Sequence, residues 1–200
     1  MIRNVQGLLA LAISAAALGY GVLLLVRAST YALPEAVSAP PSAAPAVGAG
    51  DIPVRIIIPT ISVDAPIEKA GLVAGNRMQT PRKFADAAWF AYGSVPGREG
   101  DAVIAGHKDN GLGLSGVFKH LDDLAPGDEV NIVMQSGKTI TFLVTATSSY
   151  PYDAPIPGLF STSGAARLSL ITCDGSWIDS MSEGMTYDRR LIVEASMNAM

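Results

Sequence analysis

Residues 168–175, Leu-Ser-Leu-Ile-Thr-Cys-Asp-Gly, alternate between apolar and polar side chains and then run apolar, which predicts a β-strand. The Asp-Gly pair that follows Cys173 is a turn signal, and it sets the expected end of this strand. Cys173 is the only cysteine among the 200 residues. Because a lone cysteine cannot form a disulfide within the chain, it is a buried apolar side chain, a thiol that pairs with another chain, or a nucleophile.

Two further apolar runs carry a chemically useful side chain at one end. Residues 102–107 read Ala-Val-Ile-Ala-Gly-His, so His107 closes the first run. Residues 189–193 read Arg-Arg-Leu-Ile-Val, so an arginine pair opens the second. Taken singly, each of these residues has an ordinary structural explanation. Together with Cys173 they have the arrangement of a composite site, which a fold assembles from distant parts of the chain.

The sequence after the N-terminal region favours strands over helices. Short β-branched, aromatic or alternating runs that are bounded by turn residues predict strands. Besides the three runs above, they occupy residues 54–58, 61–67, 87–92, 129–134 and 139–147. Long irregular connections are expected at residues 148–164 and 174–188. Because strands do not alternate with helices, we expect an all-β sandwich or barrel.

Local signals predict one helix and one edge strand. Residues 115–124 begin with a serine that can cap a helix, and their apolar side chains recur at three- and four-residue spacing, so we expect a short helix there. Pro66 lies in the run 61–67, and proline has no N–H to donate to a neighbouring strand. We therefore expect this run to form an edge strand.

Composition and charge argue against two classes of partner. The formal net charge is −4, and the 14 Lys and Arg residues form no cluster, so no nucleic-acid partner is expected. The two histidines and one cysteine do not show the paired spacing of zinc ligands, so we expect no structural metal and no other cofactor.

The N-terminal region predicts a membrane anchor. Residues 4–26 contain no charge and are bracketed by Arg3 and Arg27. As a helix they would reach roughly 34 Å, enough to cross the hydrocarbon core of a bilayer. A cleaved signal peptide ending at Ala32 is the competing interpretation, but this apolar run is longer than the core of such a peptide. We expect residues 1–27 to be a cytoplasmic N-terminus followed by a transmembrane helix.

A linker separates the expected anchor from the folded domain. Residues 28–51 are rich in Ala, Pro and Ser and offer few large apolar side chains to bury. Such a composition favours an extended tether. We expect a single folded domain over residues 52–200, which is an ordinary domain length.

A cysteine, a histidine and an arginine together favour acyl transfer through a thioester. A thiolate is a strong nucleophile, but an ordinary thiol is mostly protonated at neutral pH. A nearby imidazole can take the thiol proton and later supply a proton to a leaving group. A guanidinium is a permanent cation that can stabilise the oxyanion formed when a carbonyl is attacked.

The three motifs resemble those of a known family, the bacterial sortases. Residues 170–173 (Leu-Ile-Thr-Cys) look like the sortase cysteine motif, residues 103–107 like the histidine motif and residues 190–193 like the arginine strand. The order of the motifs also fits, and the resemblance covers roughly residues 53–195. Residues 106–109, Gly-His-Lys-Asp, look closest to class E and F sortases of actinobacteria.

The resemblance implies a closed eight-stranded β-barrel with one or two short helices, which acts as a membrane-anchored cysteine transpeptidase. Such an enzyme cleaves a C-terminal sorting signal, typically Leu-Pro-x-Thr-Gly, and passes the acyl group to an amine on a cell-wall precursor or a pilin lysine. The resemblance assigns Cys173 as nucleophile, His107 as general acid and base, and Arg190 as oxyanion and substrate clamp. It gives Thr172 and Arg189 supporting positions at the substrate. It also implies a single-pass protein of the cell membrane with an extracytoplasmic catalytic domain.

Two features of this sequence depart from the family pattern. Cys173 is followed by Asp174, whose negative charge would raise the pKa of the thiol unless a cation compensates it. The doublet Arg189 and Arg190 leaves open which arginine is catalytic, although counting back along the strand favours Arg190. Because side chains alternate along a strand, only one of the two arginines can face the site.

Two other functions fit parts of the sequence. A peptidoglycan transpeptidase with a catalytic cysteine would have the pattern Ser-His-Gly-Cys followed by an arginine two residues on, whereas Gly175 occupies that place here. A non-catalytic β-domain that is tethered to the membrane and binds a cell-wall component is the other alternative. It predicts that replacing His107 or Cys173 has no catalytic consequence.

Overall fold

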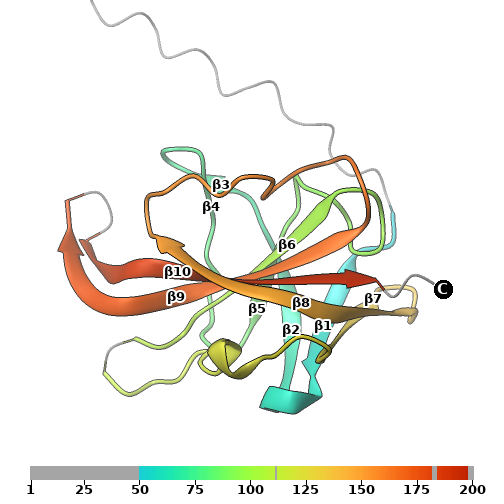
Figure 1. Ribbon diagram of the computed structural model, residues 1–200, viewed down its shortest axis with the longest axis horizontal. Helices are drawn as coiled ribbons and strands as arrows, with labels where there is room; N and C mark the ends of the chain where they lie inside the picture. The colour runs from blue at the N-terminus through green and yellow to red at the C-terminus, as the bar shows by residue number, and fades with distance from the viewer. Residues whose placement is uncertain (1–49, 111, 182–183, 198–200) are drawn as a thin grey trace, which may run out of the picture. The chain divides into compact units, whose positions relative to one another are not determined.

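The computed structural model describes residues 50–110, 112–181 and 184–197, which form a closed barrel (Figure 1). Neighbouring strands follow the order β1-β2-β5-β6-β9-β10-β8-β7, and β7 pairs with β1 to close the barrel. The barrel strands are β1 (Pro53–Ile58), β2 (Val63–Ala70), β5 (Ala87–Phe90), β6 (Asp101–Gly106), β7 (Glu129–Met134), β8 (Thr139–Pro151), β9 (Arg167–Ser180) and β10 (Gly184–Met197). The pairs β2–β5 and β6–β9 are parallel, and the other pairs are antiparallel. The expected closed eight-stranded barrel is confirmed.

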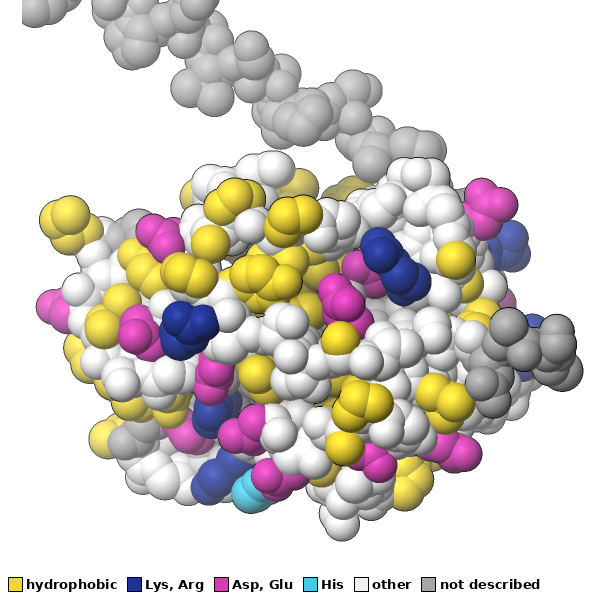
Figure 2. Space-filling view, viewed as in Figure 1, with side chains coloured by type: hydrophobic (Ala, Val, Ile, Leu, Met, Phe, Trp, Pro, Cys, Tyr) yellow, Lys and Arg dark blue, Asp and Glu magenta, His cyan; other side chains and the backbone are white. Residues whose placement is uncertain are grey.

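Short elements complete the described residues. Two 3₁₀ turns, η1 (Pro59–Ile61) and η2 (Leu121–Asp123), match the expectation of one or two short helices. A small hairpin of β3 (Leu72–Val73) and β4 (Arg77–Met78) forms its own two-stranded sheet. On the face drawn in Figure 2, Lys and Arg side chains are scattered among Asp and Glu side chains.

Alternating side chains build the core of the barrel. In β8, Ile140, Phe142 and Val144 are buried, while their neighbours along the strand are more exposed. The matching positions Val130 and Ile132 of β7 are also buried in the core. The strands expected at residues 129–134 and 139–147 are confirmed, and they pair as a hairpin whose inward face joins the core.

Strand β6 lies in the middle of the barrel wall and is almost entirely buried. Ala102 and Ile104 face the core, whereas the intervening residues face outward. The connection 152–166 packs near the start of the strand, where the Ser161 carbonyl accepts a hydrogen bond from the Asp101 N–H at 2.7 Å. A covered outer face explains why β6 reads as a continuous apolar run.

The loop predicted at residues 174–188 is wrong, because most of these residues prolong β9 and β10 into a long hairpin (Figure 1). Asp-Gly makes a bulge here, not a turn. Gly175 has φ +81°, and the carboxylate of Asp188 on β10 accepts a hydrogen bond from the Ser176 N–H at 2.7 Å. Cys173 consequently lies inside β9, not at its end.

The helix predicted over residues 115–124 is also wrong, since only η2 is helical within this range. Tertiary hydrogen bonds compete with the helical ones. The N–H groups of residues 116–118 donate to carbonyl groups of Phe84 and of residues 107–108 at 2.7 to 3.0 Å. Most of the apolar side chains that have the helical spacing do lie in the core. The pattern therefore predicts burial correctly, but it does not predict the backbone conformation.

Two strand boundaries also differ from expectation. Pro66 does not mark an edge strand, because β2 continues to Ala70 between β1 and β5. The pairing with β5 begins at Ile67, so β2 has only β1 as a neighbour up to the proline. Strand β8 extends to Pro151, which shortens the irregular connection expected from residue 148 onward.

The expected transmembrane helix and nearly all of the expected linker lie outside the described residues. Within the described residues, no helix is both long enough and apolar enough to cross a membrane. Asp51, at the end of the expected linker, accepts a hydrogen bond from the Ser136 N–H at 2.8 Å and so joins the β7–β8 turn.

Candidate active site

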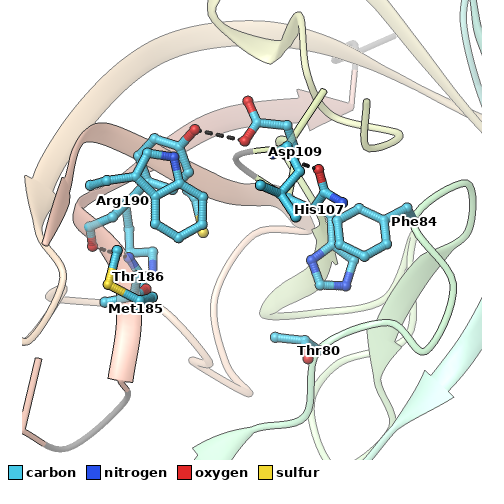
Figure 3. A pocket seen from close by; sticks show the side chains of 12 residues that line it. Thr80, Phe84, His107, Asp109, Met185, Thr186 and Arg190 are labelled. Carbon is cyan, nitrogen blue, oxygen red and sulfur yellow. Dashed lines mark hydrogen bonds between the residues drawn. The ribbon is translucent and has the colours of Figure 1, made fainter. Parts of the chain in front are cut away.

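A cleft of about 760 Å³ lies between the segment that follows β6 and the β9–β10 hairpin (Figure 3). His107, Cys173 and Arg190 all line it, although they are far apart in the sequence. In Figure 3, His107 and Phe84 lie on one side of the cleft, and Arg190 and Thr186 lie on the other.

The strand register places these three side chains in one row. Parallel pairing sets Ala105 of β6 opposite Ile171 of β9, and His107, the first residue after β6, lies two residues beyond that pair, as Cys173 does on β9. Antiparallel pairing sets Cys173 directly opposite Arg190 of β10. Residues that are directly opposite in neighbouring strands project from the same face of a sheet. We call His107, Cys173 and Arg190 the outer row.

The outer row projects away from the barrel interior. Leu168 and Leu170 of β9 are core residues, so Thr172, two positions further, shares their inward face and is only 3% exposed. Cys173 therefore points outward, where it is partly exposed and lines the cleft. Thr172 does not line the cleft, and its buried hydroxyl makes no hydrogen bond to the described residues.

His107 is held by two contacts. Its Nε2–H donates to the Pro81 carbonyl oxygen at 2.8 Å, which leaves Nδ1 as the acceptor nitrogen of the neutral ring. Its ring also stacks on Phe84, with 4.3 Å between the ring centroids. Both partners belong to the segment between β4 and β5, so this segment fixes the orientation of the imidazole.

Close backbone packing fixes the position of His107. A Cβ on Gly116 would lie 2.0 Å from the His107 carbonyl oxygen, and a Cβ on Gly106 would lie 2.4 Å from the ring of Phe118. Only glycine permits these approaches. The Phe118 N–H also donates to the His107 carbonyl oxygen at 3.0 Å.

Arg190 is positioned along its own strand. Its guanidinium donates to the carbonyl oxygens of Tyr187 at 2.8 Å and Arg189 at 3.0 Å, and to the Thr186 hydroxyl at 3.2 Å. The guanidinium carbon also lies 5.7 Å from the centre of the Tyr152 ring. These contacts fix a permanent positive charge on the β10 side of Cys173.

A tyrosine and an aspartate join the two sides of the cleft. The Tyr187 hydroxyl donates to the Asp109 carboxylate at 2.8 Å. The Tyr187 ring packs against the Trp177 ring, with 4.6 Å between the ring centroids. Burial and the hydrogen bond to Asp109 raise the pKa of Tyr187 to about 12. The hydroxyl therefore stays protonated and holds the segment after β6 to the hairpin.

Comparison with known proteins identifies the family. The sequence model of the sortase domain matches residues 56–198, which is most of the chain. The chain belongs to the sortase family. This membership confirms the resemblance that the three motifs indicated. Sortases are cysteine transpeptidases, and the matched residues include those that line the cleft described above. No curated protein sequence matches the chain significantly.

Solved sortase structures share the fold of this domain. Sortase A from Corynebacterium diphtheriae has a TM-score of 0.54 and 22% identity, over 74% of this chain and 61% of that chain. Sortase C-1 from Actinomyces oris has a TM-score of 0.55 and 24% identity, over 74% of this chain and 76% of that one. Sortase C1 of Streptococcus agalactiae, solved in complex with MTSET, has a TM-score of 0.55 and 23% identity, over 74% of this chain and 67% of that chain. At these identities the likeness shows a common fold.

A second row of polar side chains lies on the face of the sheet opposite to the outer row. Its members come from β8, β9, β10 and the segment after β6. Asp174 and Arg189 are each one position away from a member of the outer row, so alternation turns them to the other side of the sheet, and Lys108, two residues after β6, contacts Asp174 there. The Asp174 carboxylate lies 3.3 Å from the Lys108 ammonium and accepts a hydrogen bond from the Ser149 hydroxyl at 2.6 Å. We call Lys108, Asp174, Ser149 and Arg189 the inner row.

Arg189 is fixed within the inner row and does not line the cleft. Its guanidinium donates to the Ser149 hydroxyl at 2.8 Å and to the Ser149 carbonyl oxygen at 2.6 Å. The two arginines of the doublet thus face opposite ways, as alternation requires, and Arg190 is the one beside Cys173.

The cleft brings together three of the five residues expected at the site, His107, Cys173 and Arg190, but not Thr172 or Arg189. Sequence analysis missed Tyr187, Trp177 and Phe84. The quoted run of residues 106–109 already contained Asp109 and Lys108, so spacing along that run was an available signal for both. No local signal pointed to Trp177 or Tyr187, because the segment that carries them was taken for a loop.

Proposed function

We propose that this sortase-family chain is a membrane-anchored transpeptidase that cleaves a C-terminal sorting signal similar to Leu-Pro-x-Thr-Gly and joins the product to an amine on the cell surface. The observation that supports this proposal is the outer row. The thiol and the guanidinium come from the neighbouring strands β9 and β10, the imidazole comes from the residue that follows β6, and all three line one cleft. These are the groups that acyl transfer through a thioester needs.

In the acylation step, His107 takes the Cys173 proton, and the thiolate attacks the carbonyl carbon of the scissile bond. The carbonyl electrons move onto oxygen, where the Arg190 charge stabilises them. When they return, the bond from carbon to nitrogen breaks and the leaving amine takes the proton from the imidazolium. The product is a thioester on Cys173. Because the Nε2–H of His107 is held by Pro81, Nδ1 is the nitrogen that exchanges the proton.

In the second step, an acceptor amine attacks the thioester and the Cys173 thiolate leaves. His107 removes the proton that the attacking amine loses, and the amide product forms without net consumption of the enzyme. The open cleft has room for an acceptor beside the thioester, since its volume is about 760 Å³. The acceptor class we propose is a cell-wall precursor or a pilin lysine.

We also propose that residues 4–26 anchor the chain with its catalytic domain outside the cytoplasm. The uncharged apolar run and its flanking arginines support this. A protease added to intact cells is expected to digest the domain and leave the N-terminus protected. Protection of the domain, or its release from the membrane by a salt wash, would contradict the proposal.

The resemblance of residues 106–109 to class E and F sortases supports a proposed place in these classes. It rests on four residues, Gly-His-Lys-Asp. A library of sorting peptides that varies one motif position at a time is expected to reveal one preferred motif, which can be compared directly with those of sortases of each class.

The test uses the full chain in detergent with a peptide that contains the sorting signal and with an amine acceptor, read by mass spectrometry. We expect an acyl adduct on Cys173, its consumption when the amine is added, and no adduct in Cys173→Ala. His107→Ala is expected to lose turnover but keep the fold. Turnover in Cys173→Ala would eliminate the nucleophile, and the absence of any reaction in the wild-type chain would favour the non-catalytic binding domain.

A further inference from the structure

The inner row places an ion pair directly across the sheet from the outer row. Lys108 follows His107, and Asp174 follows Cys173. Their side chains meet at 3.3 Å, and each keeps only about a fifth of its surface exposed. A second carboxylate, that of Asp122, lies 4.0 Å from the Lys108 ammonium. The pair is thus partly shielded from water. Charges in such a partly buried place interact more strongly than charges on an open surface.

Several partners favour the ionised form of Asp174. Burial raises the pKa of its carboxyl, but hydrogen bonds from the Ser149 hydroxyl and the Gly175 N–H, together with Lys108, outweigh this and lower the pKa overall. Only one of these partners, Lys108, is a cation. A variant that lacks Lys108 retains the Ser149 and Gly175 donors to Asp174 but loses the cation of the ion pair.

We propose that Lys108 and Asp174 are positioning residues that together set the thiolate fraction of Cys173, with Lys108 cancelling the charge that Asp174 places behind the thiol. This inference rests on the proposed role of Cys173 as nucleophile. A negative charge close to a thiol opposes its ionisation, and a positive charge favours it. Lys108 thus supplies a cation that compensates Asp174, in addition to the Arg190 charge on the outer face.

Other charged or titratable groups also lie near Cys173 and enter any measurement of its titration. They come from the segment after β6, from the hairpin and from the inner row. These groups are His107, Asp109, Tyr187, Arg190 and Arg189. The test must therefore compare variants that leave all of these in place and change only the ion pair.

The rate of alkylation of Cys173 by iodoacetamide, measured against pH, tests the proposal. Below the thiol pKa this rate follows the thiolate fraction. Lys108→Met is expected to lower the rate at neutral pH by about three- to tenfold and to move the midpoint of the profile to higher pH. Asp174→Asn is expected to raise the rate and move the midpoint to lower pH. The double variant should fall within about twofold of the wild type, because both charges are gone.

Controls separate this electrostatic effect from a change of structure. Lys119→Met removes a half-buried lysine whose ammonium donates to the Ser115 hydroxyl, and it is expected to leave the profile unchanged. General loosening of the cleft would move both single variants in the same direction, and that result would overturn the proposal, as would single variants without any shift. Tm values for each variant show whether it folds. Alkylation needs no sorting peptide, so failure to cleave such peptides would leave this test intact.

Discussion

The two faces of the β6–β9–β10 wall differ in what their polar side chains contact. On the outer face, His107, Cys173 and Arg190 line an open cleft, and Arg190 and His107 are oriented largely by backbone carbonyl oxygens. On the inner face, Lys108, Asp174, Ser149 and Arg189 satisfy one another. One residue of register separates a row that lines the cleft from a row whose members contact one another.

This difference explains how one sheet can carry both rows. Alternation along a strand gives each pair of neighbours, such as Cys173 and Asp174, opposite directions. The outer row keeps its reactive groups oriented but accessible, while the inner row supplies fixed charge and strand cohesion behind it. The two rows should therefore respond differently to substitution, one in turnover and the other in stability and thiol reactivity.

The arginine doublet gives the largest expected contrast between the rows. Arg190→Ala removes the cation beside Cys173 and is expected to lower kcat by about 100- to 1000-fold, the usual cost of a lost oxyanion donor. Arg189→Ala removes the contacts to Ser149 and should cost far less turnover. Steady-state kinetics with a sorting peptide measures both. Equal, small effects would show that the oxyanion role is misplaced.

Substitution of Gly116 should displace His107 and so disrupt the outer row. A Cβ there would lie 2.0 Å from the His107 carbonyl oxygen, so Gly116→Ala must displace backbone. We expect a loss of about 1–3 kcal/mol in the free energy of unfolding, together with loss of turnover as His107 moves. The matched control is Gly71→Ala, whose Cβ would meet only an ordinary contact with Tyr92 at 3.5 Å. Equal stability of the two variants in urea would contradict the proposed role of Gly116.

The hydrogen bond from Tyr187 to Asp109, which joins the two sides of the cleft, should contribute less to the free energy of unfolding. Tyr187→Phe removes a hydrogen bond to Asp109 and is expected to cost about 1 kcal/mol of stability. The raised pKa of Tyr187, about 12 against an ordinary value of 10, means that the protonated hydroxyl is favoured in the folded state. The stability difference from wild type should thus be complete below pH 10 and shrink as the pH rises towards 12. A difference that grows with pH would have the wrong sign.

The smallest expected effect concerns the inner row at low pH. The pKa of Asp174 is lowered in the folded state, so its carboxylate stabilises the fold above the ordinary carboxyl pKa of about 3.9, and this contribution is lost as the pH falls through the folded value. Asp174→Asn should be less stable than wild type at neutral pH. The two should converge below about pH 4, measured by urea denaturation. A constant difference at every pH would point to packing, not charge.

Much of the wall could be predicted from the sequence because its strands are locally encoded. The alternation around Phe142 predicts both a strand and its inward face, and the apolar run before His107 predicts a strand that is buried on both faces. The row of His107, Cys173 and Arg190 needed the pairing register, which no local pattern contains. The resemblance to sortases supplied these three residues before the register was known.

The errors share one physical cause, which is that distant contacts override local signals. Asp174-Gly175 reads as a turn, but the long β10 strand pairs past it and turns it into a bulge. Residues 115–124 have helical spacing, but Gly116 packs against His107 and its N–H bonds elsewhere. The same dependence hid Tyr187 and Trp177, which reach the cleft only because the hairpin extends beyond Cys173.

A crystal structure of the full chain with a sorting-signal mimic linked by a disulfide to Cys173 tests the central claim most directly. The carbonyl mimic is expected on the outer face of β9, between the imidazole of His107 and the guanidinium of Arg190, with the Lys108–Asp174 pair intact on the other face. A mimic bound through the inner face, or a Cys173 side chain turned away from both His107 and Arg190, would contradict it.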